Sequence, residues 1–294
     1  MNKFYKISAI IAAVAAGIGL LFLMIGIACG AHGTILLTEK GFFVRDNTEK
    51  WQYSNMELEA FKNIDIDIEL AEVHVIESET EHFSISFDLT GSQDDYTFST
   101  ENETVTLESK TSNKQFSINL FGITQTTTDV VYISIPKGVQ LDDITINSDV
   151  GDVEISISDG AKKLDITTDV GNINIFDGNY EYLKMIANVG DIEVGNVEVT
   201  KNVEAIADVG KVSIEGTLLC DMKVEADVGS VTIKTHGPKE IYRYKVGADL
   251  GEVEIFGEKK GGKDSFVVSN PEGAEYLIEV EASVGSVKIS STIK

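Results

Sequence analysis

Acidic side chains recur at a fixed place in a repeated phrase, and cation binding is the chemistry that such side chains suit best. The first full copy of the phrase starts at Asp149 and reads Asp-Val-Gly-Asp-Val, and an acid or amide precedes most of its glycines. Carboxylates stacked about 5 Å apart would repel one another, and hard cations such as calcium bind oxygen ligands in such settings. The candidate ligands are Asp149, Asp169, Asn188, Asp208, Asp227 and Asp249, flanked by Asp152, Asp191 and Glu252.

Two interpretations of this acidic column stay open. An Asp or Asn beside a turn glycine also bonds to the backbone amides of the turn, so the column can consist of structural caps. The sequence lacks the glycine-rich nonapeptide of calcium-binding β-rolls. We therefore favour capping, and we predict neither a metal site nor a bound cofactor.

No group of residues points to catalysis. Each acid on the outer faces has equivalents in neighbouring repeats, so no carboxylate pair stands out for glycoside cleavage. The four histidines lack metal-ligand spacing, and Ser and Thr residues lack the context of a nucleophile elbow. Cys220 alternates in phase with Met222 and Val224, as a core thiol would, and Arg243 and Lys245 fit a solvated strand face. The sequence predicts a protein that is not an enzyme.

The charge balance excludes one class of partner. The 294 residues include 48 acidic and 24 basic side chains, which gives a net charge of −24. A basic patch for nucleic acid or for an anionic bilayer is therefore not expected. At 43% hydrophobic content, the chain still has enough apolar residues for a sizeable core.

The repeated phrase occurs seven times, and its period predicts the fold. Successive glycines are 20, 19, 20, 19, 22 and 34 residues apart, at Gly151, Gly171, Gly190, Gly210, Gly229, Gly251 and Gly285. A fixed period of this length is typical of stacked repeats, each of which buries its apolar face only against its neighbours. We predict an all-β solenoid with coils of roughly 20 residues.

Within each coil the glycine marks a corner between two short strands. Apolar or small residues alternate with polar ones before it, as in Leu164, Ile166, Thr168 and Val170, and the alternation resumes one step out of phase after it. We expect the glycine to supply the positive φ of a turn or bulge. Three residues before each glycine, the inward phase holds a small side chain, as a tight coil requires: Ser148, Thr168, Ala187, Ala207, Ala226, Ala248 and Ala282.

The regular coils extend beyond the seven exact copies. Alternation begins at Ile64, and residues 69–75 form a degenerate first coil with Ala71 in the place of the glycine. The segment 116–121 suggests an inserted hairpin, and the coil at 276–289 is expected to close the rod. We therefore assign residues 64–294 to one solenoid domain.

The amino terminus predicts a membrane anchor. Residues 7–29 are uncharged and almost wholly apolar, which suits a transmembrane helix. Lys3 and Lys6 precede this run, so the positive-inside rule makes residues 1–6 a cytoplasmic tail and the solenoid extracytoplasmic in a single-pass protein of the cell membrane. A cleaved signal peptide and a lipoprotein cysteine at Cys29 are alternatives. Residues 30–63 are expected to be a juxtamembrane connector with a short helix.

These features resemble a bacterial putative-adhesin-like domain family of unknown biochemical function. The likeness rests on the alternation from Ile64 to Val75, the strand ending in Ile135-Pro136-Lys137-Gly138, and the repeated Val-Gly phrases, and it covers residues 64–289. The resemblance implies an envelope protein with a β-solenoid behind a single anchor. It supplies no catalytic residues.

The function that we expect is binding, adhesion or a structural role in the cell envelope. The predicted partners are the cytoplasmic membrane, through residues 7–29, and a glycan, a cell-wall polymer or an envelope protein, with no nucleic acid among them. The alternative is an accessory of envelope-stress signalling that acts through a membrane partner. A carbohydrate-active enzyme is the less favoured third class.

Overall fold

The computed structural model describes residues 34–38, 41–45, 50–110, 116–118, 129–261 and 265–293. The chain divides into two compact units, Met1–Glu49 with Ser112–Thr127, and Lys50–Thr111 with Thr128–Lys294. The predicted tail at 1–6 and the predicted transmembrane helix at 7–29 lie outside the described residues. Among the residues described, no helix has the length and hydropathy needed to cross a bilayer.

The smaller unit contains a three-stranded antiparallel sheet. Its strands are β2 (Gly41–Arg45), β1 (Thr34–Thr38) and β9 (Phe116–Ile118), with β1 in the middle. Residues 116–118 form a strand, as the sequence suggests, and β9 pairs with β1. The rest of the predicted hairpin at 116–121 lies outside the described residues. The insertion hypothesis missed this partner because β1 lies far away in the sequence.

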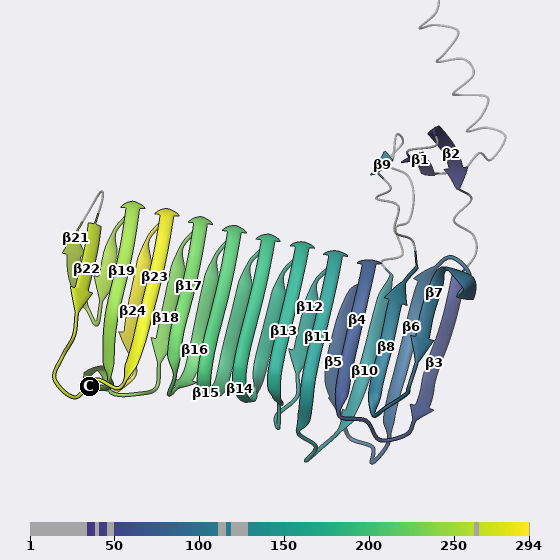
Figure 1. Ribbon diagram of the computed structural model, residues 1–294, viewed down its shortest axis with the longest axis horizontal. Coiled ribbons are helices and arrows are strands. Elements are labelled where there is room, and N and C mark those ends of the chain that lie inside the picture. The colour runs from purple at the N-terminus through teal and green to yellow at the C-terminus, as the bar shows by residue number, and fades with distance from the viewer. Residues whose placement is uncertain are drawn as a thin grey trace, which may run out of the picture. The chain divides into compact units, whose positions relative to one another are not determined.

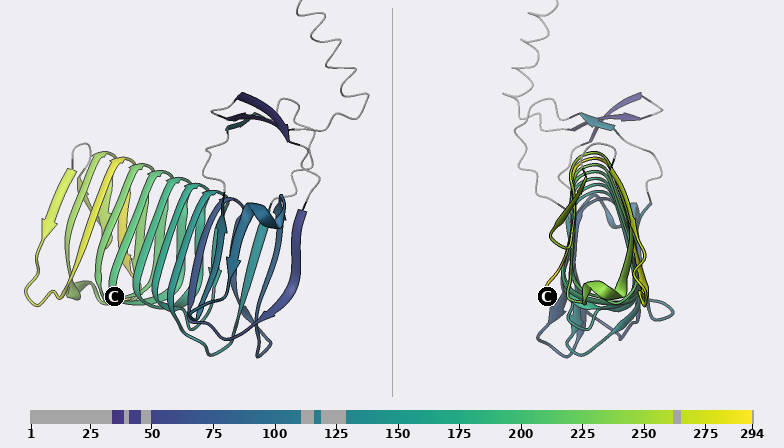
Figure 2. Two further views of the ribbon diagram at one scale, coloured as in Figure 1. Left: turned by 45° about the vertical axis from the view of Figure 1, so that its right-hand side comes forward. Right: turned by 90° about the vertical axis from the view of Figure 1, so that its left-hand side faces the viewer.

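The larger unit is a solenoid-like stack of coils, all-β as predicted (Figure 1). Viewed along the stack in Figure 2, the coils overlie one another as a narrow loop with two long sides. One side consists, in spatial order, of β8 (Thr104–Ser109), β4 (Asn63–Leu70), β11 (Leu141–Val150), β13 (Ala161–Val170), the later parts of β14 (Ile173–Val189) and β15 (Ile192–Val209), β17 (Asp221–Val228), β23 (Tyr276–Val284) and β19 (Tyr242–Leu250).

The second long side is also a parallel sheet. After each corner the chain enters this side, and it returns to the first side of the next coil through a bend at the opposite edge. Its strands are β10 (Val130–Pro136), β5 (Glu72–Ser78), β12 (Val153–Ser156), the first parts of β14 and β15, β16 (Val212–Leu218), β18 (Val231–Thr235), β24 (Val287–Ser291) and β20 (Val253–Ile255).

The core is the narrow space between the two sides. Ile144 and Ile146 of one side and Val153 and Ile155 of the other are fully buried within a single coil, and the other coils repeat this pattern. The small residues three before each glycine are buried and lie in one file across neighbouring strands, which confirms the predicted column. Each larger aliphatic residue buried here contributes roughly 1.5–3 kcal/mol relative to its exposed state.

The coils do not follow the order of the chain at the carboxyl-terminal end. The last coil, β23 with β24, pairs on one flank with β17 and β18 and on the other with β19 and β20. The prediction that residues 276–289 close the rod is therefore wrong, because β19 and β20 lie beyond them. The chain first forms the coil of β19 and β20 and then turns back through residues 258–275. Its last coil, β23 with β24, is inserted between that coil and the coil of β17 and β18 (Figure 1).

Antiparallel strands cap both ends of the stack. At one end β22 (Ser265–Ser269) pairs with β19, and β21 (Glu258–Gly261) pairs with β20. At the other end β7 (Tyr96–Ser99) pairs with β8, β6 (Phe83–Thr90) with β10, and β3 (Lys50–Leu58) with β6, and a short 3-10 helix occupies Gln93–Asp95. A second 3-10 helix, Lys239–Ile241, directly precedes β19. Such caps interrupt the parallel ladder that an open coil would offer to another chain.

The predicted connector at 30–63 needs a correction. Residues 50–58 form strand β3, which caps the stack, and not a short helix. Buried Asp129 holds this cap in place, since its carboxylate accepts hydrogen bonds from the Lys50 ammonium at 3.1 Å and from the Thr90 amide and hydroxyl, both at 2.7 Å. Burial lowers the pKa of Lys50, but its hydrogen bonds to Asp88 and Asp129 outweigh burial and raise it overall.

Candidate functional site

The corners of the coils require glycine for steric reasons, because a side chain there would clash with the neighbouring coil. A Cβ on Gly210 would lie 1.9 Å from the carbonyl oxygen of Gly190, and one on Gly229 would lie 1.6 Å from that of Gly210. The corner glycines from Gly151 onward all face the preceding coil in this way. Ala71 takes the place of the glycine in the first coil, where the neighbouring strands β8 and β10 are separated in the sequence by residues 110–129.

The acids beside the glycines cap the corners, but mainly from the position that follows the glycine. Asp152 Oδ1 accepts the Asn172 amide at 2.7 Å, Asn172 Oδ1 accepts the Asp191 amide at 2.9 Å, and Asp191 Oδ1 accepts the Lys211 amide at 2.7 Å. Each bond joins one coil to the next. On the preceding position, Asn188 donates to the Asp169 carboxylate at 2.9 Å.

The acidic column does not converge on a cation. Within the described residues, no three His, Cys, Asp or Glu side chains come close enough together to hold a metal ion. The residues Asp149, Asp169, Asn188, Asp208, Asp227 and Asp249 stay one per coil along the edge of the stack, half-exposed or exposed.

An aliphatic row follows that edge, contrary to the expected alternation. The residue before each glycine was expected to face inward, yet Val170 is 48% exposed and Asp169 beside it is exposed as well. The alternation ends at buried Thr168 because the chain bends out of the sheet at the corner. We call this row the valine ladder; in spatial order it consists of Leu70, Val150, Val170, Val189, Val209, Val228, Val284 and Leu250.

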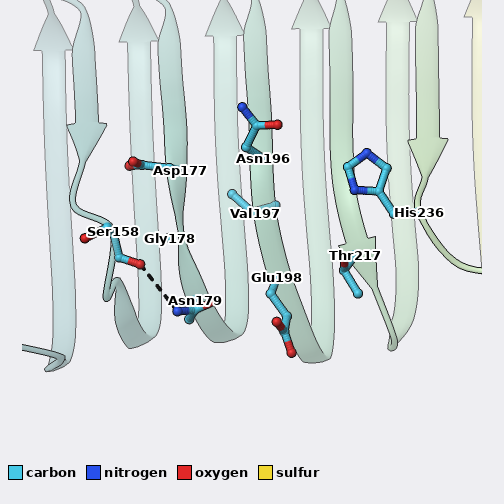
Figure 3. A pocket seen from close by; sticks show the side chains of 9 residues that line it. All are labelled: Ser158, Asp177, Gly178, Asn179, Asn196, Val197, Glu198, Thr217 and His236. Carbon is cyan, nitrogen blue, oxygen red and sulfur yellow. Dashed lines mark hydrogen bonds between the residues drawn. The ribbon is translucent and has the colours of Figure 1, made fainter. Parts of the chain in front are cut away.

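A shallow polar groove lies on the bend side of the coils, where sequence reasoning placed no site (Figure 3). Its cavity measures about 290 Å³, and successive coils supply its lining. Strand pairing brings Asn179 beside Glu198, and Glu198 beside Thr217. We call it the polar groove; it is lined by Ser158, Asp177, Gly178, Asn179, Asn196, Val197, Glu198, Thr217 and His236.

Several of these side chains are available to a ligand. Asn196, Glu198 and Thr217 make no hydrogen bond or ion pair with other residues that the structure describes. The ends of the groove are more constrained, because Asn179 donates to the Ser158 carbonyl at 3.3 Å and His236 lies 3.4 Å from a Glu215 carboxylate oxygen. The groove thus presents amide, hydroxyl and carboxylate groups along a line.

Asp177 is the groove residue whose hydrogen-bonding capacity is not satisfied. One of its carboxylate oxygens is buried without a hydrogen-bond partner in the described structure. Burial raises the pKa of this carboxyl, and the negative charge of Glu77 raises it further. The buried oxygen therefore has unused hydrogen-bonding capacity that a polar ligand group could fill.

A second hollow, of about 610 Å³, is a weaker candidate. Its apolar wall includes Phe61 and Phe83, and its rim is charged. The rim charges pair with one another, Lys62 with Glu103 at 2.9 Å and Lys162 with Asp142 at 2.5 Å. Fewer of its groups are left for a ligand.

The remaining residues considered for chemistry have structural partners. Cys220 is buried in the core, which raises the pKa of its thiol to about 12. Lys245 pairs with Glu279 of the inserted coil. His74 stacks on Tyr132 and lies 3.0 Å from a Glu154 oxygen. Cys29 lies outside the described residues.

Comparison with known proteins agrees with the class that the fold defines, a solenoid-like all-β protein with stacked coils. The Toastrack DUF4097 family matches residues 61–273. The chain belongs to this family. No curated protein matches it.

Solved structures show distant similarity. A putative adhesin from Bacteroides fragilis is 16% identical, with 82% of this chain and 97% of that chain covered and a TM-score of 0.39. A putative adhesin from Parabacteroides merdae is 14% identical over 82% and 98% of the two chains, with a TM-score of 0.40. A putative lipid binding protein from Parabacteroides distasonis is 15% identical over 84% and 96%, with a TM-score of 0.38.

Proposed function

We propose that this chain is an extracytoplasmic binding module that holds a glycan or cell-wall polymer in the polar groove. The observation that carries the proposal is the run of unpartnered polar groups at Asn196, Glu198 and Thr217. Parallel strands repeat at about 4.8 Å, so successive coils offer polar groups at regular intervals to successive units of a polymer. Hydroxyl-rich polymers match such a line of donors and acceptors.

The groove is built for retention and not for turnover. Its lining spreads over five successive coil segments (Figure 3). A polymer held by several weak polar contacts gains affinity from their number, as expected for an adhesin or an envelope structural protein. We therefore propose a role without catalysis.

Anchoring belongs to the same proposal. The uncharged run at residues 7–29, with Lys3 and Lys6 before it, supports a single-pass anchor in the cell membrane with the coil stack outside. This arrangement presents the groove to envelope polymers. The signalling alternative stays a prediction, and no specific contact among the described residues favours it.

The groove prediction is tested with the full chain and fragments of cell-wall polymer in a pull-down and by calorimetry. Replacing Asn196→Ala and Glu198→Ala together is expected to weaken binding about fivefold or more, because each lost hydrogen bond costs about 0.5–1.5 kcal/mol. The matched control replaces Asn174→Ala and Glu193→Ala, which are register partners on the same strands but do not line the groove. Equal binding by both double variants would show that the polar groove does not bind the polymer.

A further inference from the structure

Within the described part of the larger unit, no element covers the valine ladder. Its eight members lie one per coil, and their exposed fractions run from 43% to 55%. Strand pairing places each one directly beside the next, as in Val189 beside Val209 and Val209 beside Val228. Mutual stacking covers part of each side chain, but the outer half forms one continuous apolar strip.

Acids border the strip on both flanks. The residues that precede the ladder include Glu69, Asp149, Asp169, Asp208, Asp227 and Asp249, and those that follow its glycines include Glu72, Asp152, Asp191 and Glu252. Lys211 is the basic residue at these flanking positions of the described coils. An apolar strip between negative borders suits a partner that is apolar in the middle and positive at its sides.

We propose that the valine ladder docks a cationic amphipathic helix, which lies along the corner edge of the stack. Its aliphatic face would contact the ladder, and its Lys or Arg side chains would reach the bordering carboxylates. A second copy of this chain is disfavoured because two such edges would bring their acids together.

The dimensions of a helix agree with this edge. A helix presents a new turn every 5.4 Å or so, and neighbouring coils are about 4.8 Å apart, so three or four turns stay nearly in step with the ladder. An extended strand repeats each face after roughly 6.6–6.8 Å and loses this match sooner. The central members Val189 and Val209 would contact any helix of that length placed midway along the stack.

The test uses the full chain in phosphatidylcholine nanodiscs and an 18-residue peptide with leucines on one helical face and lysines on the other. Binding is followed by fluorescence anisotropy, with empty nanodiscs as the blank. We expect saturable binding that weakens as salt screens the charges. Val189→Thr with Val209→Thr should raise the Kd about tenfold, since two apolar contacts are lost.

Three controls complete the experiment. A peptide with glutamate in place of lysine, and a scrambled peptide without an apolar face, should both fail to bind. Asn196→Ala with Glu198→Ala, in the polar groove, should leave the Kd unchanged, which separates this proposal from the proposed function. If the threonine variant melts early, Asp169→Asn with Asp208→Asn serves instead and should weaken binding several-fold.

Three results would overturn the proposal. They are an unchanged Kd in the threonine and asparagine variants, equal binding of the glutamate peptide, and a dimer in sedimentation that the threonine substitutions dissociate. The last result would assign the ladder to a second copy of the chain.

Discussion

Gly210→Ala should lower the free energy of unfolding by at least about 3 kcal/mol, which places it among the severe point substitutions. The added methyl group would meet the Gly190 carbonyl oxygen at 1.9 Å. The carbonyl oxygen belongs to the backbone, and the position of the methyl group is fixed by the backbone of residue 210. The clash is therefore relieved only if the two coils move apart. A fall in Tm of roughly 6–12 °C is expected for a domain of this size.

Gly195→Ala is the matched control, since Gly195 lies in β15, the strand that ends one residue before Gly210. The nearest atom to an added Cβ there is the Phe176 carbonyl oxygen at 3.7 Å, an ordinary contact. We expect a change within about 1 kcal/mol in either direction. Thermal and denaturant unfolding of both variants measures the difference, and similar values for the two would show that corner glycines are not sterically required.

The carboxyl-terminal coil should exchange its amide hydrogens as slowly as an interior coil. Residues 276–284 pair with β17 on one flank and β19 on the other, so their amides are released only when the surrounding stack opens. We expect protection at 276–291 within about tenfold of that at 221–235, measured by hydrogen exchange with mass spectrometry.

Strand β22 provides the internal comparison for that experiment. It pairs only with β19 among the described strands, and Phe266 and Val268 are exposed, so it should exchange much faster. Rapid exchange at 276–291, as in a fraying terminus, would contradict the inserted position.

The repeating part of the fold follows from local sequence. Glycine spacing predicts the corners, and the small residues at Thr168, Ala187 and Ala207 predict a narrow interior, because both constraints act within one coil or between identical coils. Capping was expected from the acids before the glycines, whereas the printed bonds to backbone amides come from the residues after the glycines and join neighbouring coils.

The order of the coils could not be predicted in the same way. The corners have nearly identical sequences, so any coil could pack beside any other. The repeats alone therefore do not determine which coils are neighbours in the stack. The 34-residue spacing before Gly285 was the available signal. The residues between Gly251 and Gly285 include the cap strands β21 and β22, through which the chain runs back to the inserted coil.

The two candidate surfaces were hidden for different reasons. The valine ladder was assigned to the core because strict alternation was extended one residue too far, to Val170. The polar groove lies at the bends, where no phrase repeats and Asn179, Glu198 and Thr217 share only their register. A period of about 19 residues among unlike polar side chains is a weak signal without the strand pairing.

The order of the coils is the central claim about the fold, and paired cysteines on the corner edge test it most directly. Val228 and Val284 are register partners on neighbouring strands, so Val228→Cys with Val284→Cys should form a disulfide under mild oxidation. Val228→Cys with Leu250→Cys should not, because the inserted coil separates them and their Cα atoms lie about 10 Å apart. A disulfide in the second pair and none in the first would show that the coils stack in chain order, contrary to this account.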